Sequence, residues 1–313
     1  MKIANALPEG YLLHQYRIAK TLGGGGFSIV YLAHDTQANR RVVIKEYLPA
    51  KQAARGDGET VESLTAESVT TFNTGMKRFF DEANALAKVT HPNIVRVIDF
   101  FRENNTVYMV MNYEEGRDLR WYIKRHDGRM TEKFIRTVFP QLLQGLHELH
   151  NHRLLHLDIK PANVYLRPGG SPLLLDFGAA QSAHVDERHA GPHTLTRGFA
   201  PIEQHTRGHI GPWTDLYAIG ATMWACMCGR APPPATKRAV KDTYKPAVRQ
   251  FARYYSRQLL EAVDWCLQMD QVARPQKVDD LLGFLNKEPA GTPPPEPESL
   301  IDRINLKLPW NRK

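Results

Sequence analysis

Hydrophobic residues in the first third of the chain follow strand-like spacing, interrupted by one segment of helical spacing. Apolar runs bounded by glycine or polar residues predict β-strands at residues 16–22, 29–34 and 41–45. Residues 77–88 carry Phe79, Ala83 and Leu86 at spacings that place all three on one face of a helix. This part of the chain is therefore predicted to hold a β-sheet and one helix.

From residue 112 onward the pattern is mainly helical. Thr131 precedes a helical pattern that continues to Leu149, and threonine is a typical N-cap at such a position. The longest apolar stretch, residues 216–228, is too short to span a bilayer and predicts a buried helix. The chain thus divides into a smaller strand-rich part and a larger helical part.

Three segments fall outside this pattern. Residues 1–14 are a short leader without the apolar core of a signal peptide. Residues 47–76 form a long connection, which is either functional, partly structured or a disordered surface insertion. Residues 287–313 begin as a stiff proline-rich linker and end in a short apolar and basic tail. That tail is interpreted either as a docking segment for a partner or an anionic membrane surface, or as a frayed terminus.

Two polar segments in the helical part suit phosphoryl transfer. They read His-Leu-Asp-Ile-Lys-Pro-Ala-Asn at residues 156–163 and Leu-Leu-Leu-Asp-Phe-Gly at residues 173–178. Asp158 can accept the proton of an attacking hydroxyl, and Lys160 can neutralise charge on the transferring group. Asn163 and Asp176 offer oxygen atoms to a metal ion that sits on the phosphates. The joint occurrence of these groups is far more specific than any one of them.

A phosphate-covering loop and a buried lysine would complete such a site, and the strand-rich part contains both. Residues 22–28 read Leu-Gly-Gly-Gly-Gly-Phe-Ser, and glycines let backbone N–H groups approach phosphates. Lys45 ends an apolar strand, and a buried lysine is costly to desolvate unless it meets an anion. Glu82 lies beside the apolar face of the predicted helix, where its carboxylate can hold that lysine.

In these motifs and their order, residues 13–286 resemble the eukaryotic-type (Hanks-type) serine/threonine protein kinases of bacteria. The resemblance implies an α+β fold with two lobes: a small, mainly-β N-lobe with one key helix, and a larger, mainly-α C-lobe. It places the N-lobe at residues 15–111, with an insertion at 47–76, and the C-lobe at residues 112–286.

The resemblance also assigns roles to individual residues. It implies that the catalytic residues are Asp158, Lys160 and Asn163, and that the metal ligands are Asn163 and Asp176. The implied nucleotide-binding residues are Leu22, Gly23, Gly24, Gly25, Gly26, Phe27, Ser28, Val30, Lys45, Glu82, Met111, Tyr113, Asp118 and Asp176. In the part that would bind a peptide substrate, Glu203 is expected to pair with Arg274, and Asp215 is expected to brace the catalytic loop.

Two departures from the family pattern bear on regulation and specificity. Leu157 stands where the family usually has an arginine that meets a phosphate on the activation segment. Activity is therefore expected to depend less on phosphorylation of that segment. Thr194 is the cleaner site to test, because Thr196 sits where the family has a threonine that contacts the catalytic loop. Ala162 stands where basic-directed kinases often carry an acidic residue, so a preference for arginine-rich substrates is not supported.

Composition narrows the choice of partners and compartment. The net charge is +8 and the pI about 9.3, but no dense basic block contains interleaved aromatic residues. Nucleic acid is therefore not an expected partner, and ATP and acidic proteins account for the charge.

Three cysteines are consistent with reduced thiols in the cytoplasm, and a metal site at Cys226 and Cys228 would lack a second pair. Five histidines lie in or just after the activation segment. They are interpreted as part of a solvated, flexible loop and not as a metal or pH-sensing site: His184, His189, His193, His205 and His209.

These features predict a cytoplasmic, ATP-dependent kinase that phosphorylates serine and threonine of proteins, including itself, in signal transduction. The expected cofactors are ATP and Mg²⁺, with Mn²⁺ as its alternative. The expected partners are protein substrates, a cognate phosphatase and phosphothreonine-binding proteins, and no transmembrane segment is expected.

Two alternatives remain open. A small-molecule phosphotransferase would not need the Glu203 motif, Asp215 and Arg274, and a nucleotide-binding pseudokinase scaffold would not need the full catalytic set.

Overall fold

The computed structural model describes residues 3–56, 58–176, 181–182 and 195–287. The chain divides into two compact units, the first formed by residues 1–91 with 95–114 and the second by residues 92–94 with 115–313. Several residues named above lie outside the described ones: residues 1–2 of the leader, residue 57 of the insertion, residues 177–178 of the second polar segment, His184, His189, His193, Thr194, and residues 288–313, nearly all of the linker and tail.

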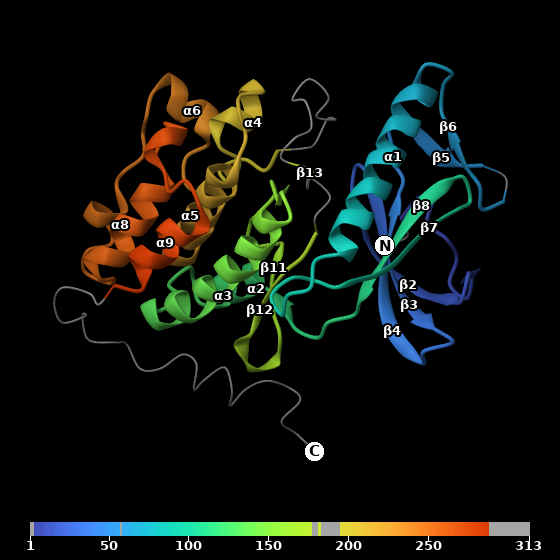
Figure 1. The fold of residues 1–313 in the computed structure, drawn as a ribbon, viewed down its shortest axis with the longest axis horizontal. Helices are drawn as coiled ribbons and strands as arrows, with labels where there is room; N and C mark the ends of the chain where they lie inside the picture. Colours follow the sequence, from blue (N-terminus) through green and yellow to red (C-terminus); the bar gives the residue numbers. More distant parts are fainter. Residues whose placement is uncertain (1–2, 57, 177–180, 183–194, 288–313) are drawn as a thin grey trace. The chain divides into compact units, whose positions relative to one another are not determined.

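A six-stranded antiparallel sheet forms the body of the first unit (Figure 1). Its strands, in spatial order, are β1 (Leu12–Leu13), β2 (Tyr16–Gly24), β3 (Ser28–Asp35), β4 (Arg40–Tyr47), β8 (Thr106–Asn112) and β7 (Val97–Glu103). Buried residues alternate with partly exposed ones along all of β3, as expected for a strand with one face on the core. The three predicted strands are confirmed, and each extends at most two residues further at either end.

The helix of the first unit, α1 (Ser68–Ala87), packs on β7 and β8 (Figure 1). Its buried residues Phe79, Ala83 and Leu86 confirm the predicted apolar face, which Phe72 extends by two turns. The helix begins at Ser68 and not at residue 77, so the predicted start was wrong. The polar residues of this first part hid the start from an analysis of apolar spacing.

The connection between β4 and α1 is folded in its described residues, so the interpretation of a disordered insertion is wrong there. It forms a hairpin of β5 (Ala53–Arg55) and β6 (Val61–Ser63). The Arg55 guanidinium binds both carboxylate oxygens of Glu46, at 2.6 and 2.7 Å, and Glu46 is fully buried. The hydroxyls of Tyr31 and Tyr108 donate to the same carboxylate, at 2.6 and 2.8 Å. Glu46 thereby joins the insertion to the central strands of the sheet.

The leader is fastened to the same cluster. Arg55 Nε donates to the carbonyl of Asn5 at 2.9 Å, and the backbone N–H of Leu7 donates to the Tyr31 hydroxyl at 3.1 Å. Leu7 itself is only 2% exposed. A buried carboxylate therefore organises three separate segments around the strand that carries Lys45.

The second unit is mainly helical. Its helices are α2 (Leu119–Arg125), α3 (Glu132–Asn151), α4 (Ile202–Thr206), α5 (Pro212–Cys228), α6 (Ala235–Val240), α7 (Ala247–Gln250), α8 (Arg257–Cys266) and α9 (Val278–Leu285), with 3₁₀ turns at Pro168–Gly170 and Gln271–Ala273. Its short strands are β9 (Arg117–Asp118), β10 (Leu154–Leu155), β11 (Val164–Leu166), β12 (Pro172–Leu174) and β13 (Gln181–Ser182). Thr131 caps α3 by accepting a hydrogen bond from the N–H of Phe134 at 3.1 Å, which confirms the predicted N-cap.

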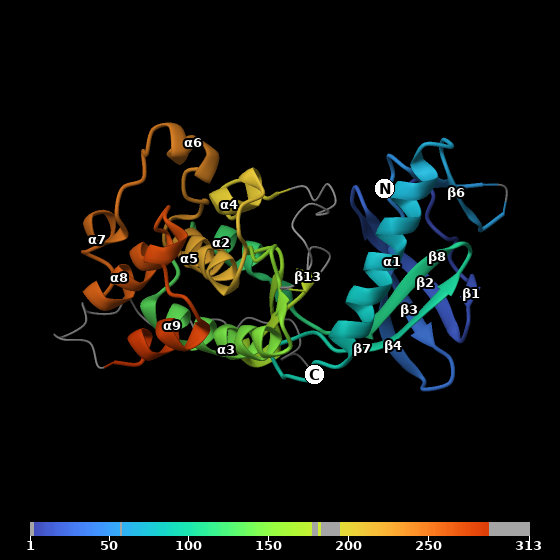
Figure 2. The same ribbon diagram turned by 45° about the horizontal axis from the view of Figure 1, so that its top comes forward.

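Helix α5 forms the core of this unit and packs against α3 and α8 (Figure 2). It is buried on nearly all sides, as the apolar stretch at residues 216–228 predicted. Helix α9 contacts α3 and α8. Within the described ranges, no helix is both long enough and apolar enough to cross a membrane.

The buried charge pair of the first unit makes a stability prediction. Arg55→Ala leaves the Glu46 carboxylate buried without its cation, so we expect the first unit to lose about 3 kcal/mol of stability. Hydrogen–deuterium exchange of β4 and β8 amides measures this loss. Tryptophan fluorescence does not report on this unit, because all five tryptophans lie after residue 114.

The matched control is Arg17→Ala, which removes an exposed arginine from β2 and should leave β4 exchange unchanged. Combining Arg55→Ala with Glu46→Gln removes the buried charge as well and should recover part of the loss. Equal protection of β4 in Arg55→Ala and the wild type would contradict the prediction.

Candidate active site

The predicted catalytic residues meet at one carboxylate. Asp158 lies between β10 and β11, and its two oxygens accept hydrogen bonds from Lys160 Nζ at 2.9 and 2.7 Å. Asn163 Nδ2 donates to Asp158 Oδ2 at 3.0 Å and to the Asp158 carbonyl at 2.8 Å. Thr196 Oγ1 donates to Asp158 Oδ1 at 2.9 Å and accepts from Lys160 at 3.0 Å. The structure thus brings Asp158, Lys160 and Asn163 together. Thr196 joins them, as expected from its position in the sequence, where the family has a threonine that contacts this loop.

The two predicted metal ligands flank a pair of strands: Asn163 directly precedes β11, and Asp176 follows β12. β11 pairs antiparallel with β12, and the Leu175 N–H donates to the Asn163 carbonyl at 2.8 Å. Asp176, the next residue, is exposed and has a left-handed backbone with φ of 59°. Pairing therefore places these two residues at adjacent ends of the hairpin. Their donor atoms are oxygens, which Mg²⁺ prefers, so the residues present fit a Mg²⁺–nucleotide.

His156 connects the two polar segments. Its Nδ1 accepts a hydrogen bond from the Asp158 N–H at 3.3 Å, and its Nε2 donates to the Leu175 carbonyl at 3.1 Å. The side chain is fully buried. One imidazole therefore fixes the distance between the loop of Asp158 and the strand end that carries Asp176.

Asp215 of α5 holds the start of the catalytic loop, as predicted. Its carboxylate accepts the backbone N–H groups of His156 and Leu157 at 2.9 and 2.7 Å. Leu157 has a φ of 61°, which turns consecutive N–H groups toward one carboxylate. His150 Nε2 lies 2.9 Å from the same carboxylate. Burial by itself would raise the pKa of Asp215, but the interactions with His150 and His156 outweigh burial and lower that pKa.

Leu157 occupies the place where the resemblance expects an arginine. Its side chain is 8% exposed, and its carbonyl accepts a hydrogen bond from Gln204 Nε2 at 2.9 Å. An apolar, buried side chain offers no donor to a phosphate. The environment of Leu157 is therefore consistent with the predicted loss of the arginine–phosphate contact.

In the first unit, Lys45 and Glu82 lie near the same helix face. Lys45 belongs to β4 and is 7% exposed, with its Nζ 5.9 Å from the ring centroid of Phe79. Glu82 is half-buried and follows Phe79 by three residues on α1, so both project from one side of the helix. Lys45 pairs across the sheet with Val30 of β3, another predicted nucleotide-binding residue.

The glycine-rich segment forms the turn between β2 and β3. The Gly25 N–H donates to the Ser28 carbonyl at 2.9 Å and closes this turn. A Cβ added at Gly23, Gly25 or Gly26 would contact nothing within 4 Å, so these glycines leave open space along the turn. Gly24 differs, because a Cβ there would lie 3.0 Å from Ile3 of the leader. Open backbone of this kind fits a loop that lies over phosphates.

The other predicted nucleotide-binding residues fall at several places. Leu22 is 48% exposed and Phe27 lies within the β2–β3 turn. Met111 is 9% exposed on β8, and Tyr113 follows that strand with the Arg41 guanidinium 4.2 Å from its ring centroid. Asp118, in the second unit, caps α2 by accepting the Trp121 N–H at 3.0 Å.

Behind the catalytic loop, Glu203 and Arg274 form the predicted ion pair. Arg274 binds both Glu203 oxygens, at 2.6 and 3.1 Å, and its side chain is fully buried. The Arg274 guanidinium also lies 4.9 Å from the Tyr217 ring centroid. Thr214 Oγ1 donates to Glu203 at 3.1 Å. The bidentate pair ties α4, which follows Thr196, to the residue after the 3₁₀ turn Gln271–Ala273, and the hydrogen bond from Thr214 ties α4 to α5.

A family model described as the protein kinase domain matches residues 16–282. The chain belongs to the protein kinase domain family. Its α+β fold, with a mainly-β unit that holds one key helix and a larger helical unit, is the protein kinase fold, as the sequence predicted.

Bacterial serine/threonine kinases are among the relatives of this kinase domain. It is 32% identical over 235 residues to "Serine/threonine-protein kinase PknA" of Nostoc sp. (strain PCC 7120 / SAG 25.82 / UTEX 2576), covering 72% of this chain and 39% of the relative. It is 29% identical to "Serine/threonine-protein kinase PrkC" of Bacillus subtilis (strain 168), covering 70% and 31%. The chain therefore matches less than half of the length of these curated relatives. A solved structure titled "PpkA-294 apo form" is 35% identical, with a TM-score of 0.79, covering 90% of this chain and all of that chain.

Three supporting residues of this kinase domain escaped the sequence analysis. His156 was read as part of a motif without a role, while His150 and Gln204 were not singled out. Their partners lie far away in sequence: His150 meets Asp215, and Gln204 meets the Leu157 carbonyl. Only the motif position of His156 offered a signal. The other two contacts arise from tertiary packing.

The cysteines and the described histidines have structural surroundings. Cys226 and Cys266 are fully buried, and burial raises the pKa of both thiols. None of the three cysteines forms a disulfide. His209 packs against the Trp213 ring, with centroids 5.5 Å apart, and burial lowers the pKa of His205. In the part of the chain that the structure describes, no group of three or more His, Cys, Asp or Glu side chains is placed to hold a metal ion.

The buried Asp215 predicts a pH-dependent contribution to stability. Its folded-state pKa is lower than its unfolded one, so the carboxylate stabilises the fold fully above about pH 4 and loses this effect as the pH falls further. We expect Asp215→Asn to lower the free energy of unfolding by about 3 kcal/mol at neutral pH. The difference from the wild type should shrink below about pH 4. Urea denaturation followed by tryptophan fluorescence measures both, because Trp213 and Trp224 lie on the same helix.

Asp279→Asn is the control, because Asp279 is exposed and its contact with His147 should contribute less than about 1 kcal/mol. A difference between Asp215→Asn and the wild type that stays constant from pH 7 to pH 3 would contradict the assigned direction of the pKa.

Proposed function

We propose that the chain is an ATP-dependent protein kinase that transfers the γ-phosphoryl group to serine and threonine hydroxyls of proteins, including its own. The observation that carries the proposal is the convergence of Lys160, Asn163 and Thr196 on the Asp158 carboxylate. Membership of the protein kinase family and the names of the bacterial relatives support it. The buried Glu203–Arg274 pair favours a protein substrate over a small molecule, because the resemblance links this pair to peptide binding.

Each residue of the cluster has a role in this proposal. Asp158 orients the acceptor hydroxyl and accepts its proton, while Lys160 stabilises negative charge that develops during transfer. Asn163 and Asp176 would hold the metal ions. ATP with Mg²⁺, or with Mn²⁺, would supply the phosphoryl group and its charge neutralisation. Lys45, oriented by Glu82, would bind the α- and β-phosphates.

The remaining nucleotide contacts and the lobe boundaries belong to the same proposal. We assign the phosphate-covering role to residues 22–28 with Val30, the adenine pocket to Met111 and Tyr113, and a ribose contact to Asp118. The N-lobe would comprise residues 15–111 and the C-lobe residues 112–286. The open space at the glycine turn and the burial of Met111 support these assignments.

The cellular setting is also a proposal. Kinship with bacterial kinases suggests a role in signal transduction, with a cognate phosphatase and phosphothreonine-binding proteins as partners. Three cysteines without a disulfide support a cytoplasmic location.

The activity is tested with radiolabelled ATP, Mg²⁺ and a mixture of serine and threonine peptides. We expect phosphoserine or phosphothreonine with the wild type, and a loss in kcat/KM of about 10²–10⁴ in Asp158→Asn, because proton acceptance is removed. The control Asp81→Asn removes an exposed carboxylate from α1 and should keep full activity. Tight ATP binding without transfer to any peptide would refute the kinase proposal and favour a nucleotide-binding scaffold.

Replacement of the two neighbouring threonines tests independence from activation-segment phosphorylation. We expect Thr194→Ala to retain kcat/KM within about threefold, because the buried Leu157 offers no group to bind a phosphate. Thr196→Ala should lose about tenfold, because it removes the hydrogen bonds to Asp158 and Lys160, whereas Thr196→Ser should retain activity. A hundredfold loss in Thr194→Ala would overturn this expectation.

A further inference from the structure

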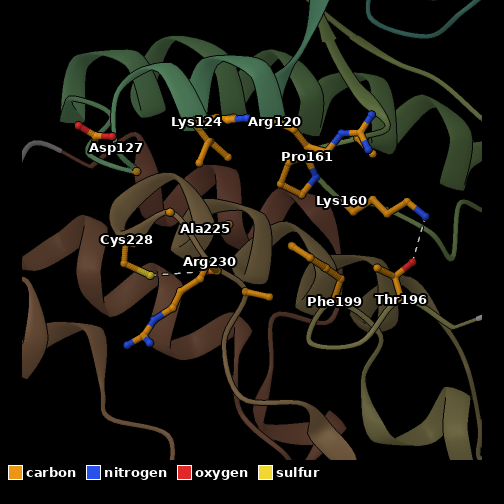
Figure 3. Close-up of a pocket in the computed structure, with 15 residues that line it drawn as sticks. Arg120, Lys124, Asp127, Lys160, Pro161, Thr196, Phe199, Ala225, Cys228 and Arg230 are labelled. Atoms are coloured by element: carbon orange, nitrogen blue, oxygen red, sulfur yellow. Dashed lines mark hydrogen bonds between the residues drawn. The ribbon is translucent and has the colours of Figure 1, made fainter.

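A cavity of about 770 Å³ lies in the second unit next to the catalytic cluster (Figure 3). Its walls come from α2, residues 160–162 of the catalytic loop, the segment of Thr196 and Phe199, and the end of α5 with the residues that follow it. Lys160 and Thr196 belong both to this wall and to the hydrogen-bonded cluster at Asp158. Anything bound in the cavity therefore lies beside the position of the acceptor hydroxyl.

The charged side chains of the cavity are mostly basic. Arg120, Lys124, Lys160 and Arg230 face a single acidic residue, Asp127. Figure 3 shows Asp127 at the opposite end of the cavity from Lys160 and Thr196. A cationic group placed near the acceptor would thus meet like charges, and an anionic group would meet opposite ones.

Of the four basic residues, Lys124 and Arg230 are available to a ligand. The other two are already paired with carboxylates: Arg120 binds Asp118 at 2.8 Å, and Lys160 binds Asp158. Lys124 and Arg230 are both exposed, and neither forms an ion pair with a carboxylate in the described ranges of the chain. They come from different elements, α2 and the turn after α5, so the fold and not the local sequence brings them to one cavity.

The cavity also has apolar and small residues between its charges. Ile123 and Ala225 are buried at 7% and 3% exposure, and Phe199 and Ala162 complete this surface. An apolar wall lowers the local dielectric constant and strengthens the attraction between a bound anion and nearby cations. Ala162 and Ala225 are also too small and too apolar to bind a cationic side chain. The cavity lining therefore combines attraction for an anion with a single carboxylate, that of Asp127, which lies at the far end from Lys160 and Thr196.

We propose that this cavity binds an anionic side chain of the substrate, either the carboxylate of Asp or Glu or a phosphoryl group, a few residues from the acceptor. The inference rests on the proposed kinase function and names the class of substrate that this site takes. Lys124 and Arg230 determine the preference, and the chain's net charge of +8 favours acidic partners in the same direction.

The test compares four threonine peptides with the full chain. They share one neutral sequence and differ in the residues around the acceptor, which are neutral, glutamate, phosphoserine or arginine. Both kcat/KM for transfer and Kd by fluorescence anisotropy are measured. We expect the glutamate or phosphoserine peptide to have a kcat/KM at least tenfold higher, and a Kd at least tenfold lower, than the arginine peptide. A larger advantage for phosphoserine identifies a phosphoryl group as the source of the anion, and an equal or larger advantage for glutamate identifies a carboxylate.

Charge reversal then assigns the effect to the cavity. The double variant Lys124→Glu with Arg230→Glu should lower the ratio of the glutamate to the arginine peptide at least tenfold. The matched control, Arg125→Glu with Lys237→Glu, changes the same total charge on α2 and α6 but not in the cavity, and should preserve the ratio. Added salt should reduce the ratio in the wild type.

The outcomes separate this inference from the kinase function. Phosphoryl transfer with equal kcat/KM for the four peptides, or with an arginine preference, would refute the cavity's role and leave the kinase function intact. An equal change of the ratio in the control would also refute it, because the effect would then be one of net charge. Tight binding of the anionic peptide that is lost in the double variant, without transfer, would support the cavity and refute the kinase function.

Discussion

The carboxylate of Asp215 positions the catalytic loop, and the arrangement around Asp158 depends on it. Two consecutive backbone N–H groups, those of His156 and Leu157, point at this one carboxylate. Such convergence requires the left-handed backbone at Leu157, which an L-residue adopts at a cost of about 1–2 kcal/mol. A buried anion supplies the compensating hydrogen bonds. Because Asp158 follows at once, the carboxylate on α5 determines where the residues of the cluster lie.

In the first unit, a second buried carboxylate has a comparable effect on β4. Successive side chains of a strand point to opposite faces, so Glu46 and Lys45 lie on different sides of the sheet. Glu46 binds Arg55 of the insertion and the hydroxyls of two tyrosines, whereas Lys45 and Tyr47 both approach Phe79 of α1. The insertion and the leader therefore support the face of β4 opposite to the one that carries Lys45, the residue proposed to bind the nucleotide. The long insertion thus has a structural role, because its Arg55 neutralises the buried Glu46 carboxylate of β4.

Two groups of charged residues near the Asp158 cluster differ in burial and in pairing. Behind the loop, Glu203 neutralises Arg274 in a closed, buried pair. Beside the loop, the cavity keeps exposed basic groups at Lys124 and Arg230. A satisfied buried pair holds the scaffold in place, while cations near solvent remain able to attract a charged substrate. The Glu203–Arg274 pair is thus buried, whereas Lys124 and Arg230, the proposed recognition residues, are exposed.

Sequence alone determined the motifs, the fold family and most of the core periodicity, because local spacing and short motifs carry that information. It predicted the helix face at Phe79, the cap at Thr131 and the Glu203–Arg274 pair, the last through resemblance. It did not reveal the hairpin inside residues 47–76, the contact of His150 with Asp215, or the basic cavity. Each of these joins residues that are far apart in sequence and whose polar side chains have no periodicity of their own. Only the tertiary structure, by burying or grouping these charges, decided what they contact.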